Sequence, residues 1–132
     1  MNKIEHIGIA VNDLKTSNNL FEKLLGVAPY KEEEVASEGV ITSFFNTGPN
    51  KIELLASTSE DGPIAKFLAK KGEGIHHIAF AVDDIITEMA RLKKEGFILL
   101  NEVPKKGADN KLVAFVHPKS SNGVLIELCQ EA

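Results

Sequence analysis

An internal repeat constrains the fold of this chain more than any other feature. The phrase EHIGIAVNDL near the N-terminus returns as HHIAFAVDDI in the second half, and the aligned histidines are His6 and His77. Further along, NKIELLAS is echoed by VLIELCQE, which aligns Glu53 with Glu127. The repeat predicts two copies of one structural unit within a chain of 132 residues.

Both copies carry the same order of secondary-structure signals. An alternating strand is followed by a candidate helix N-cap, Asp13 in one copy and Asp83 or Asp84 in the other, and the helical pattern ends at Gly26 or Gly96. Three more strands follow in each copy, near residues 29–35, 40–47 and 51–57, and near 97–103, 111–117 and 124–130. Each copy is therefore predicted to be a β-α-β-β-β module.

The apolar positions predict which helix faces are buried. They are Leu14, Leu20, Phe21, Leu24 and Leu25 in the first copy, and Ile85, Ile86, Met89 and Leu92 in the second. Between the copies, Pro63 suits a first helical turn and Gly72 an end, so a short helix is expected there.

The modules are not expected to be stable alone. A four-stranded sheet with a helix on one face leaves its other face uncovered, whereas two such sheets can close around a shared cavity. The predicted fold is α+β, with two βαβββ modules forming a curved, cupped mixed sheet around a metal site. One domain is expected over residues 1–132, with module 1 at 1–60, a linker helix at 61–73 and module 2 at 74–132.

Strand parity predicts which side chains line the cavity. His6 shares its face with Gly8 and Ala10, and His77 shares its face with Ala79 and Ala81, so parity selects His77 over its neighbour His76. The two glutamates, Glu53 and Glu127, each face opposite to their apolar neighbours and hence to the same side as the histidines.

This set of side chains predicts a metal site. Taken alone, each histidine or glutamate could be an ordinary polar residue of a sheet, but buried carboxylates are costly without a cation. Two imidazoles and two carboxylates suit a first-row divalent ion with water completing the shell, and a single cysteine argues against a closed structural zinc site.

Charge and cysteine content exclude several classes of partner. The net charge of −4 and scattered lysines predict no nucleic-acid binding. One cysteine, and no recognisable signal peptide, lipidation motif or transmembrane run, make the cytoplasm the expected compartment and a membrane partner unexpected.

The motifs HIGIAV, PIAKFL, EGIHHIAFAVDDI and HPKSSNGVLIEL give the chain a family resemblance. It resembles the vicinal oxygen chelate (glyoxalase/bleomycin resistance/dioxygenase) superfamily over essentially its whole length, and within it small bacterial glyoxalase I enzymes and methylmalonyl-CoA epimerases. The resemblance implies that His6, Glu53, His77 and Glu127 hold the metal, because they match the ligand set of glyoxalase I. Some epimerases carry a second catalytic glutamate where this chain has Thr42.

The resemblance implies proton abstraction beside a carbonyl, with Glu127 as the mobile base and Glu53 as a ligand able to act on the opposite side. Glyoxalase I (lactoylglutathione lyase) activity on the glutathione hemithioacetal of methylglyoxal is the first expectation, with nickel or cobalt preferred and zinc or manganese as alternatives. Methylmalonyl-CoA epimerase activity on an acyl-CoA is the alternative. Against it, the inferred ligand faces offer no cation for a free carboxylate except Lys51, and the one arginine, Arg91, lies on a helix.

Two rival functions remain open at this point. One is a metal-free binding protein that sequesters a ligand, which retention of four ligand-type residues disfavours. The other is an extradiol dioxygenase, in which Glu53 would occupy a position that oxygen chemistry needs open. The protein is expected to be a homodimer.

The remaining polar residues have secondary roles. Residues 105–111 suit a mobile loop or a plain turn. Lys119, Ser120 and Ser121 could meet an anionic part of the substrate or form a solvated turn, His76 and His117 are expected to be structural or supporting, and Cys129 to pack.

Overall fold

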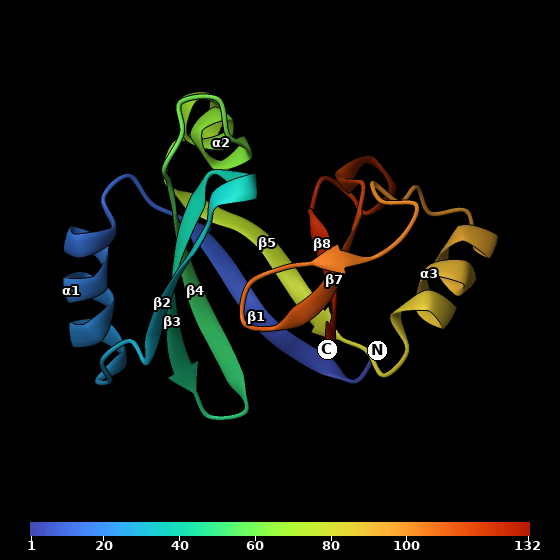
Figure 1. Ribbon diagram of the computed structural model, residues 1–132, viewed down its shortest axis with the longest axis horizontal. Coiled ribbons are helices and arrows are strands. Elements are labelled where there is room, and N and C mark those ends of the chain that lie inside the picture. The colour runs from blue at the N-terminus through green and yellow to red at the C-terminus, as the bar shows by residue number, and fades with distance from the viewer. The chain divides into compact units, whose positions relative to one another are not determined.

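The computed structural model describes all residues, 1–132. It has an α+β fold with three helices and eight strands, arranged as two βαβββ modules joined by a linker helix. The chain forms two compact units (Figure 1). The N-terminal unit is His6–His76, and the C-terminal unit combines Met1–Glu5 with His77–Ala132. None of the helices has the length and apolar character needed to cross a bilayer.

The sheet of the N-terminal unit has the strand order β2-β3-β4-β1. β1 runs parallel to β4, and the β2–β3 and β3–β4 pairs are antiparallel. The elements are β1 (Lys3–Ala10, of which His6 onward belongs here), α1 (Leu14–Leu25), β2 (Lys31–Val35), β3 (Val40–Thr47), β4 (Asn50–Ser57) and α2 (Pro63–Lys71).

The C-terminal unit repeats this plan, with the order β5-β8-β7-β6 and a parallel β5–β8 pair. Its elements are β5 (Gly74–Ala81, of which His77 onward belongs here), α3 (Ile85–Lys94), β6 (Lys105–Lys106), β7 (Lys111–Val116) and β8 (Ile126–Glu131). Met1–Glu5, which includes the first residues of β1, also belongs to this unit. The Asn2 N–H donates to the Ala81 carbonyl at 2.8 Å. The equivalence of the two strand orders confirms the structural repeat.

The core of the N-terminal unit lies between α1 and one face of its sheet. Val11, Phe45 and Leu54 are buried there, and the α1 residues that pack on them are Leu14, Phe21 and Leu25. Leu20 and Leu24 do not join them, being 60% and 70% exposed. At 100° per residue these two positions lie about 80–120° away from the buried stripe, so the predicted apolar face was too wide.

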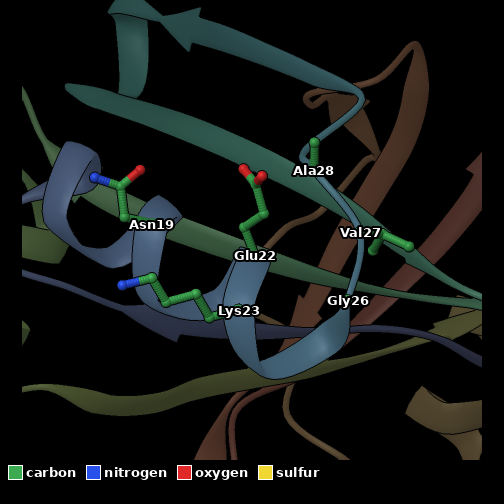
Figure 2. A pocket seen from close by; sticks show the side chains of 6 residues that line it. All are labelled: Asn19, Glu22, Lys23, Gly26, Val27 and Ala28. Atoms are coloured by element: carbon green, nitrogen blue, oxygen red, sulfur yellow. The ribbon is translucent and has the colours of Figure 1, made fainter.

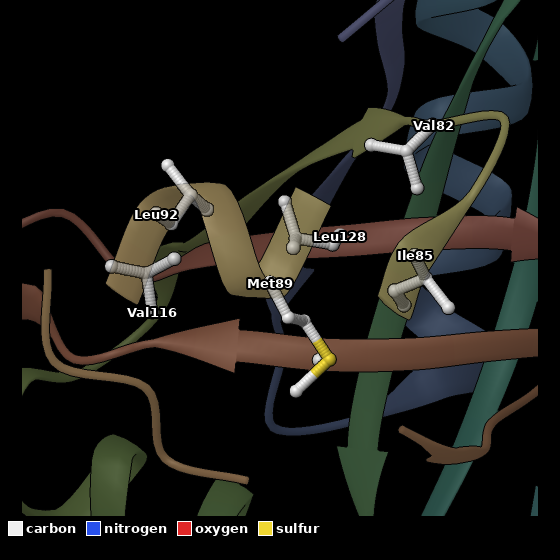
Figure 3. Close-up of a cluster of buried hydrophobic side chains, with 7 residues drawn as sticks. Val82, Ile85, Met89, Leu92, Val116 and Leu128 are labelled. Carbon is white, nitrogen blue, oxygen red and sulfur yellow. The ribbon is translucent and has the colours of Figure 1, made fainter. Parts of the chain in front are cut away.

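The core of the C-terminal unit lies between α3 and the sheet strands β7 and β8. Figure 3 shows this cluster and labels Val82, Ile85, Met89, Leu92, Val116 and Leu128, to which Ala114 also belongs. Ile86 was expected on the buried face, but it is 60% exposed because it is adjacent to Ile85 and therefore turned about 100° from it.

The predicted strand at residues 97–103 is wrong. Only Leu99 forms an isolated bridge, to Val116, and the strand that pairs regularly with β7 is the two-residue β6. The Asn101 side-chain oxygen accepts the backbone N–H of Phe115 at 2.9 Å, which takes the place of a regular ladder hydrogen bond. Side-chain competition for the backbone thus shortens the strand.

The helices begin and end close to the predicted residues, but the two N-cap aspartates make different hydrogen bonds. Gly26 adopts φ 75°, the left-handed conformation expected after a helix. Asp84 caps α3 by accepting the Thr87 backbone N–H at 3.2 Å. Asp13 is the N-cap of α1 without a cap hydrogen bond to the backbone, because its carboxylate accepts the Thr16 hydroxyl at 2.6 Å.

Candidate functional site

In the N-terminal unit, His6 and Glu53 form a buried pair on the neighbouring strands β1 and β4. The parallel register places Gly8 opposite Glu53, which leaves space for the carboxylate next to the imidazole. His6 Nδ1 lies 3.1 Å from Glu53 Oε2, and the two side chains are only 5% and 8% exposed.

The C-terminal unit contains the equivalent pair, His77 and Glu127, on β5 and β8. Here Ala79 lies opposite Glu127, and His77 Nε2 is 3.0 Å from Glu127 Oε1. The other carboxylate oxygen, Oε2, accepts a hydrogen bond from the Cys129 thiol at 2.9 Å. Cys129 was expected only to pack, whereas its thiol also binds the Glu127 carboxylate. The two side chains are two residues apart on one strand and so share a face, which could have indicated this contact.

The distinction between the adjacent histidines follows the predicted parity. His77 is buried beside Glu127, whereas His76 is half-buried in the N-terminal unit and meets the Phe67 ring edge-on, with centroids 4.9 Å apart. His117 is occupied locally, because its Nδ1 accepts the Lys119 backbone N–H at 3.0 Å.

Each pair has the donor chemistry that a divalent first-row metal requires, with an imidazole nitrogen and a carboxylate oxygen 3.1 Å apart in one unit and 3.0 Å apart in the other, within ion-pair distance. Buried imidazole and carboxylate donors therefore fit such an ion in either unit.

An aromatic ring stands beside each carboxylate in the strand register. Phe44 is opposite Glu53 in the β3–β4 pair, and Phe115 is opposite Glu127 in the β7–β8 pair. The Phe115 ring lies nearly perpendicular to the His77 ring, at 84° and a centroid distance of 6.2 Å. These rings exclude water from one side of each pair, and the sequence reasoning did not single them out.

Lysines also lie on these faces, which corrects the expectation that Lys51 is the only cation there. The register places Lys31 opposite Phe44, Lys105 opposite Val113 and Lys111 opposite Glu131. Because Val113 and Glu131 share their faces with Phe115 and Glu127 respectively, Lys105 and Lys111 lie on the Glu127 face. Parity had been followed only along the strands that carry the histidines and glutamates, so the lysines of the adjoining strands were missed.

The His6 face of the N-terminal unit is not free of helices. Ala10 and Leu55, which share that face with His6 and Glu53, are buried against Ile64 of α2. Thr42 points to the same side, since it lies opposite Leu55, and its 2% exposure shows that it is covered. The linker helix therefore closes one end of this face.

Residues 105–111 form a β-hairpin. The Gly107 N–H donates to the Lys111 carbonyl at 2.9 Å, and Asp109 and Asn110 adopt φ 58° and 55°, as tight hairpin turns require.

The serines after β7 serve the local backbone. The Ser120 hydroxyl accepts the Ile98 N–H at 3.0 Å, and the Ser121 hydroxyl donates to the Val124 carbonyl at 2.7 Å. A turn was one of the two expectations for these residues, and these contacts show that the hydroxyls are used within it.

A separate hollow of about 570 Å³ lies at the C-terminal end of α1 (Figure 2). It is open to the surface and contains none of the predicted site residues, so it is a different site from the two His–Glu pairs. Its lining residues are Asn19, Glu22, Lys23, Gly26, Val27 and Ala28.

Residues 5–115 match the family model described as the glyoxalase/bleomycin resistance protein/dioxygenase superfamily. The ethylmalonyl-CoA/methylmalonyl-CoA epimerase of Cereibacter sphaeroides is 40% identical, with 97% of each chain covered. A hypothetical protein of Bacillus halodurans is 43% identical, with a TM-score of 0.96, 99% of this chain and 95% of that chain covered. A variant of Streptomyces coelicolor methylmalonyl-CoA epimerase in complex with 2-nitronate-propionyl-CoA is 33% identical, with a TM-score of 0.94 over 100% of this chain and 96% of that one.

Proposed function

Because this chain belongs to the glyoxalase/bleomycin resistance protein/dioxygenase superfamily and is an enzyme of its metal-dependent isomerase and epimerase type, we propose that it is a methylmalonyl-CoA epimerase. The observation that carries the proposal is the repeated buried His–Glu pair, combined with relatives of that name over the whole chain. Methylmalonyl-CoA has a C–H bond between a carboxylate and a thioester carbonyl, and the thioester acidifies it because the negative charge left by the proton is delocalised onto the carbonyl oxygen.

We place the metal on the two pairs together, with His6, Glu53, His77 and Glu127 as its ligands within one domain of residues 1–132. The burial of two imidazoles and two carboxylates, a donor set suited to such an ion, supports this assignment. A divalent ion held by these residues would supply positive charge next to the thioester carbonyl oxygen while the proton is removed from the neighbouring carbon. Nickel or cobalt as the native metal stays a prediction.

The residues of the chain perform the proton transfers. Glu127 takes the proton from the substrate carbon, and its second oxygen is held by the Cys129 thiol. Glu53, protonated at the start of the turnover, gives its proton to the opposite face of the carbon, a role that Thr42 cannot fill because a hydroxyl is too weakly acidic. The turnover leaves Glu127 protonated and Glu53 ionised, and proton exchange with water returns Glu127 to the carboxylate and Glu53 to the acid.

Glyoxalase I activity was the first expectation, and two findings favour the epimerase instead. Several relatives that match nearly the whole chain are methylmalonyl-CoA epimerases by name. The argument that a free carboxylate would find no cation except Lys51 is also weakened, because Lys105 lies on the Glu127 face, whereas Lys31 and Lys111 are paired with Glu33 and Glu131.

A paired assay tests the reaction. Protein loaded in turn with cobalt, nickel, zinc and manganese is expected to exchange solvent deuterium into methylmalonyl-CoA and to form no thioester from methylglyoxal and glutathione. Thioester formation without exchange would return the assignment to glyoxalase I.

The base is tested by Glu127→Gln. An amide can still coordinate a metal but cannot accept the proton, so turnover is expected to fall at least about 100-fold while bound metal is retained. Turnover close to that of the unmodified protein, with metal present, would move the base to another residue.

The ligand assignment is tested by elemental analysis of protein purified without chelator. One divalent metal per chain is expected, with a large loss in His77→Ala and little change in the matched variant His76→Ala, whose imidazole contacts Phe67. Equal metal content in both variants would contradict the assignment.

A further inference from the structure

The two units repeat a second arrangement besides the His–Glu pair. In the N-terminal unit, Lys31 Nζ lies over the Phe44 ring, 5.4 Å from its centroid. In the C-terminal unit, Lys105 Nζ lies over the Phe115 ring at 5.9 Å. In each case an edge-strand ammonium is held over the aromatic ring that stands beside the buried glutamate.

The surroundings of the two lysines differ in charge. Lys31 begins β2, whose next three residues are glutamates, and Lys31 Nζ lies 3.1 Å from Glu33. Lys105 begins β6, whose other residue, Lys106, pairs with Leu112 and points to the opposite face. Lys111, at the start of β7, is paired with Glu131, 2.6 Å from its Nζ. The glutamates of β2 repel an anion from the first edge, whereas β6 offers the positive charge of Lys105 with no carboxylate on the same strand.

We infer that Lys105 binds an anionic oxygen of the acyl-CoA substrate, and this inference rests on the proposed function. One aromatic ring separates its ammonium from the imidazole of His77, because Phe115 contacts both. Lys105 is exposed, so a bound anion can reach it without burying an unpaired charge. The anion is either the malonyl carboxylate or a phosphate of CoA, which share this chemistry.

The chain supplies a matched control for the test. Lys106 is adjacent and equally positive, but it pairs in register with Leu112 and so points to the opposite face of the sheet. Lys105→Met and Lys106→Met therefore remove the same charge from the same strand. Lys105→Arg retains the charge and is expected to restore most of the binding.

The experiment measures binding by calorimetry and KM for methylmalonyl-CoA, together with binding of CoA and of methylmalonyl-pantetheine. Lys105→Met is expected to weaken methylmalonyl-CoA binding about tenfold, and Lys106→Met less than about twofold. A loss confined to CoA and methylmalonyl-CoA assigns the phosphates, and a loss confined to the two methylmalonyl compounds assigns the carboxylate.

Equal effects of the two methionine variants would overturn the role of Lys105 while leaving the proposed function intact. Failure of the unmodified protein to bind any of the three compounds would instead overturn the proposed function and this inference with it.

Discussion

Both oxygens of the Glu127 carboxylate are engaged in the C-terminal unit. Oε1 faces His77 Nε2, and Oε2 accepts the Cys129 thiol. A hydrogen bond to one carboxylate oxygen restricts the orientations of the other, and a misplaced carboxylate loses contact with the substrate proton. The thiol therefore has a positioning effect on the base, in addition to its packing in the sheet.

We expect Cys129→Ala to lower kcat about fivefold while metal content is unchanged, which corresponds to the loss of about 1 kcal/mol from one hydrogen bond. Cys129→Ser retains a donor and is the control. A kcat for the alanine variant equal to that of the unmodified protein would show that the thiol does not position the base.

Ser43 is a second residue with a local consequence. It is fully buried, its hydroxyl has no hydrogen-bond partner, and it lies between Ile41 and Phe45 on the core face of β3. Ser43→Ala should raise the free energy of unfolding in urea by up to about 1 kcal/mol, because an unsatisfied polar group is removed. The control Ser57→Ala should lower it, since the Ser57 hydroxyl accepts the Ser59 N–H at 3.2 Å.

At the scale of single elements, α3 depends on ionised side chains in its first turn. The Thr87 backbone hydrogen bond holds the pKa of Asp84 below its ordinary value of 3.8. The hydrogen bond from Arg91 lowers the pKa of Glu88 below 4.5. A carboxyl group whose pKa is lowered by folding stabilises the folded state above the unfolded pKa, and this contribution disappears as the pH falls through the folded pKa.

The effect of Asp84→Ala should therefore depend on pH. At pH 7 the variant is expected to be less stable than the unmodified protein, and the difference should shrink as the pH falls below 3.8. Asp13→Ala, which alters an N-cap that makes no cap hydrogen bond to the backbone, is the matched control and should show a smaller difference at pH 7. Urea titrations at several pH values measure both, and a pH-independent difference would contradict the expectation.

The success of the sequence prediction varied with the range of the interactions involved. Helix ends, the repeated module and the faces of His6, His77, Glu53 and Glu127 follow from local patterns, so they could be predicted. The irregular segment at 97–103 could not, because it depends on a hydrogen bond from Phe115 to Asn101 across strands. The lysines on the site faces depend on the register of edge strands, which parity within one strand does not supply.

At the scale of the whole molecule, the boundary between the two units does not coincide with the predicted module boundaries. Residues 1–5 belong to the same unit as residues 77–132. Besides the backbone contact to Ala81, the Asn2 side chain donates to Asp83 at 2.8 Å. The single domain of 1–132, the homodimer and the cytoplasmic location stay predictions.

A fragment of residues 77–132 is expected to be largely unfolded on its own. It lacks residues 1–5, which include the beginning of β1, and a chain of this size buries too little apolar surface to tolerate that loss. A second fragment that joins residues 1–5 to 77–132 through a flexible linker should show more protected amides in hydrogen exchange. Equal protection in the two fragments would contradict the role of the N-terminal residues.

The division of the C-terminal unit also affects how the nascent chain folds. Residues 1–5 leave the ribosome before residues 6–76, and the β-strand and the turn that they contact are completed only after the whole N-terminal unit has been synthesised. At ordinary translation rates this delay is on the order of ten seconds. During that time residues 1–5 lack the partners that they have in the folded unit, so the unit that carries His77 and Glu127 is completed by a segment that was synthesised well before it.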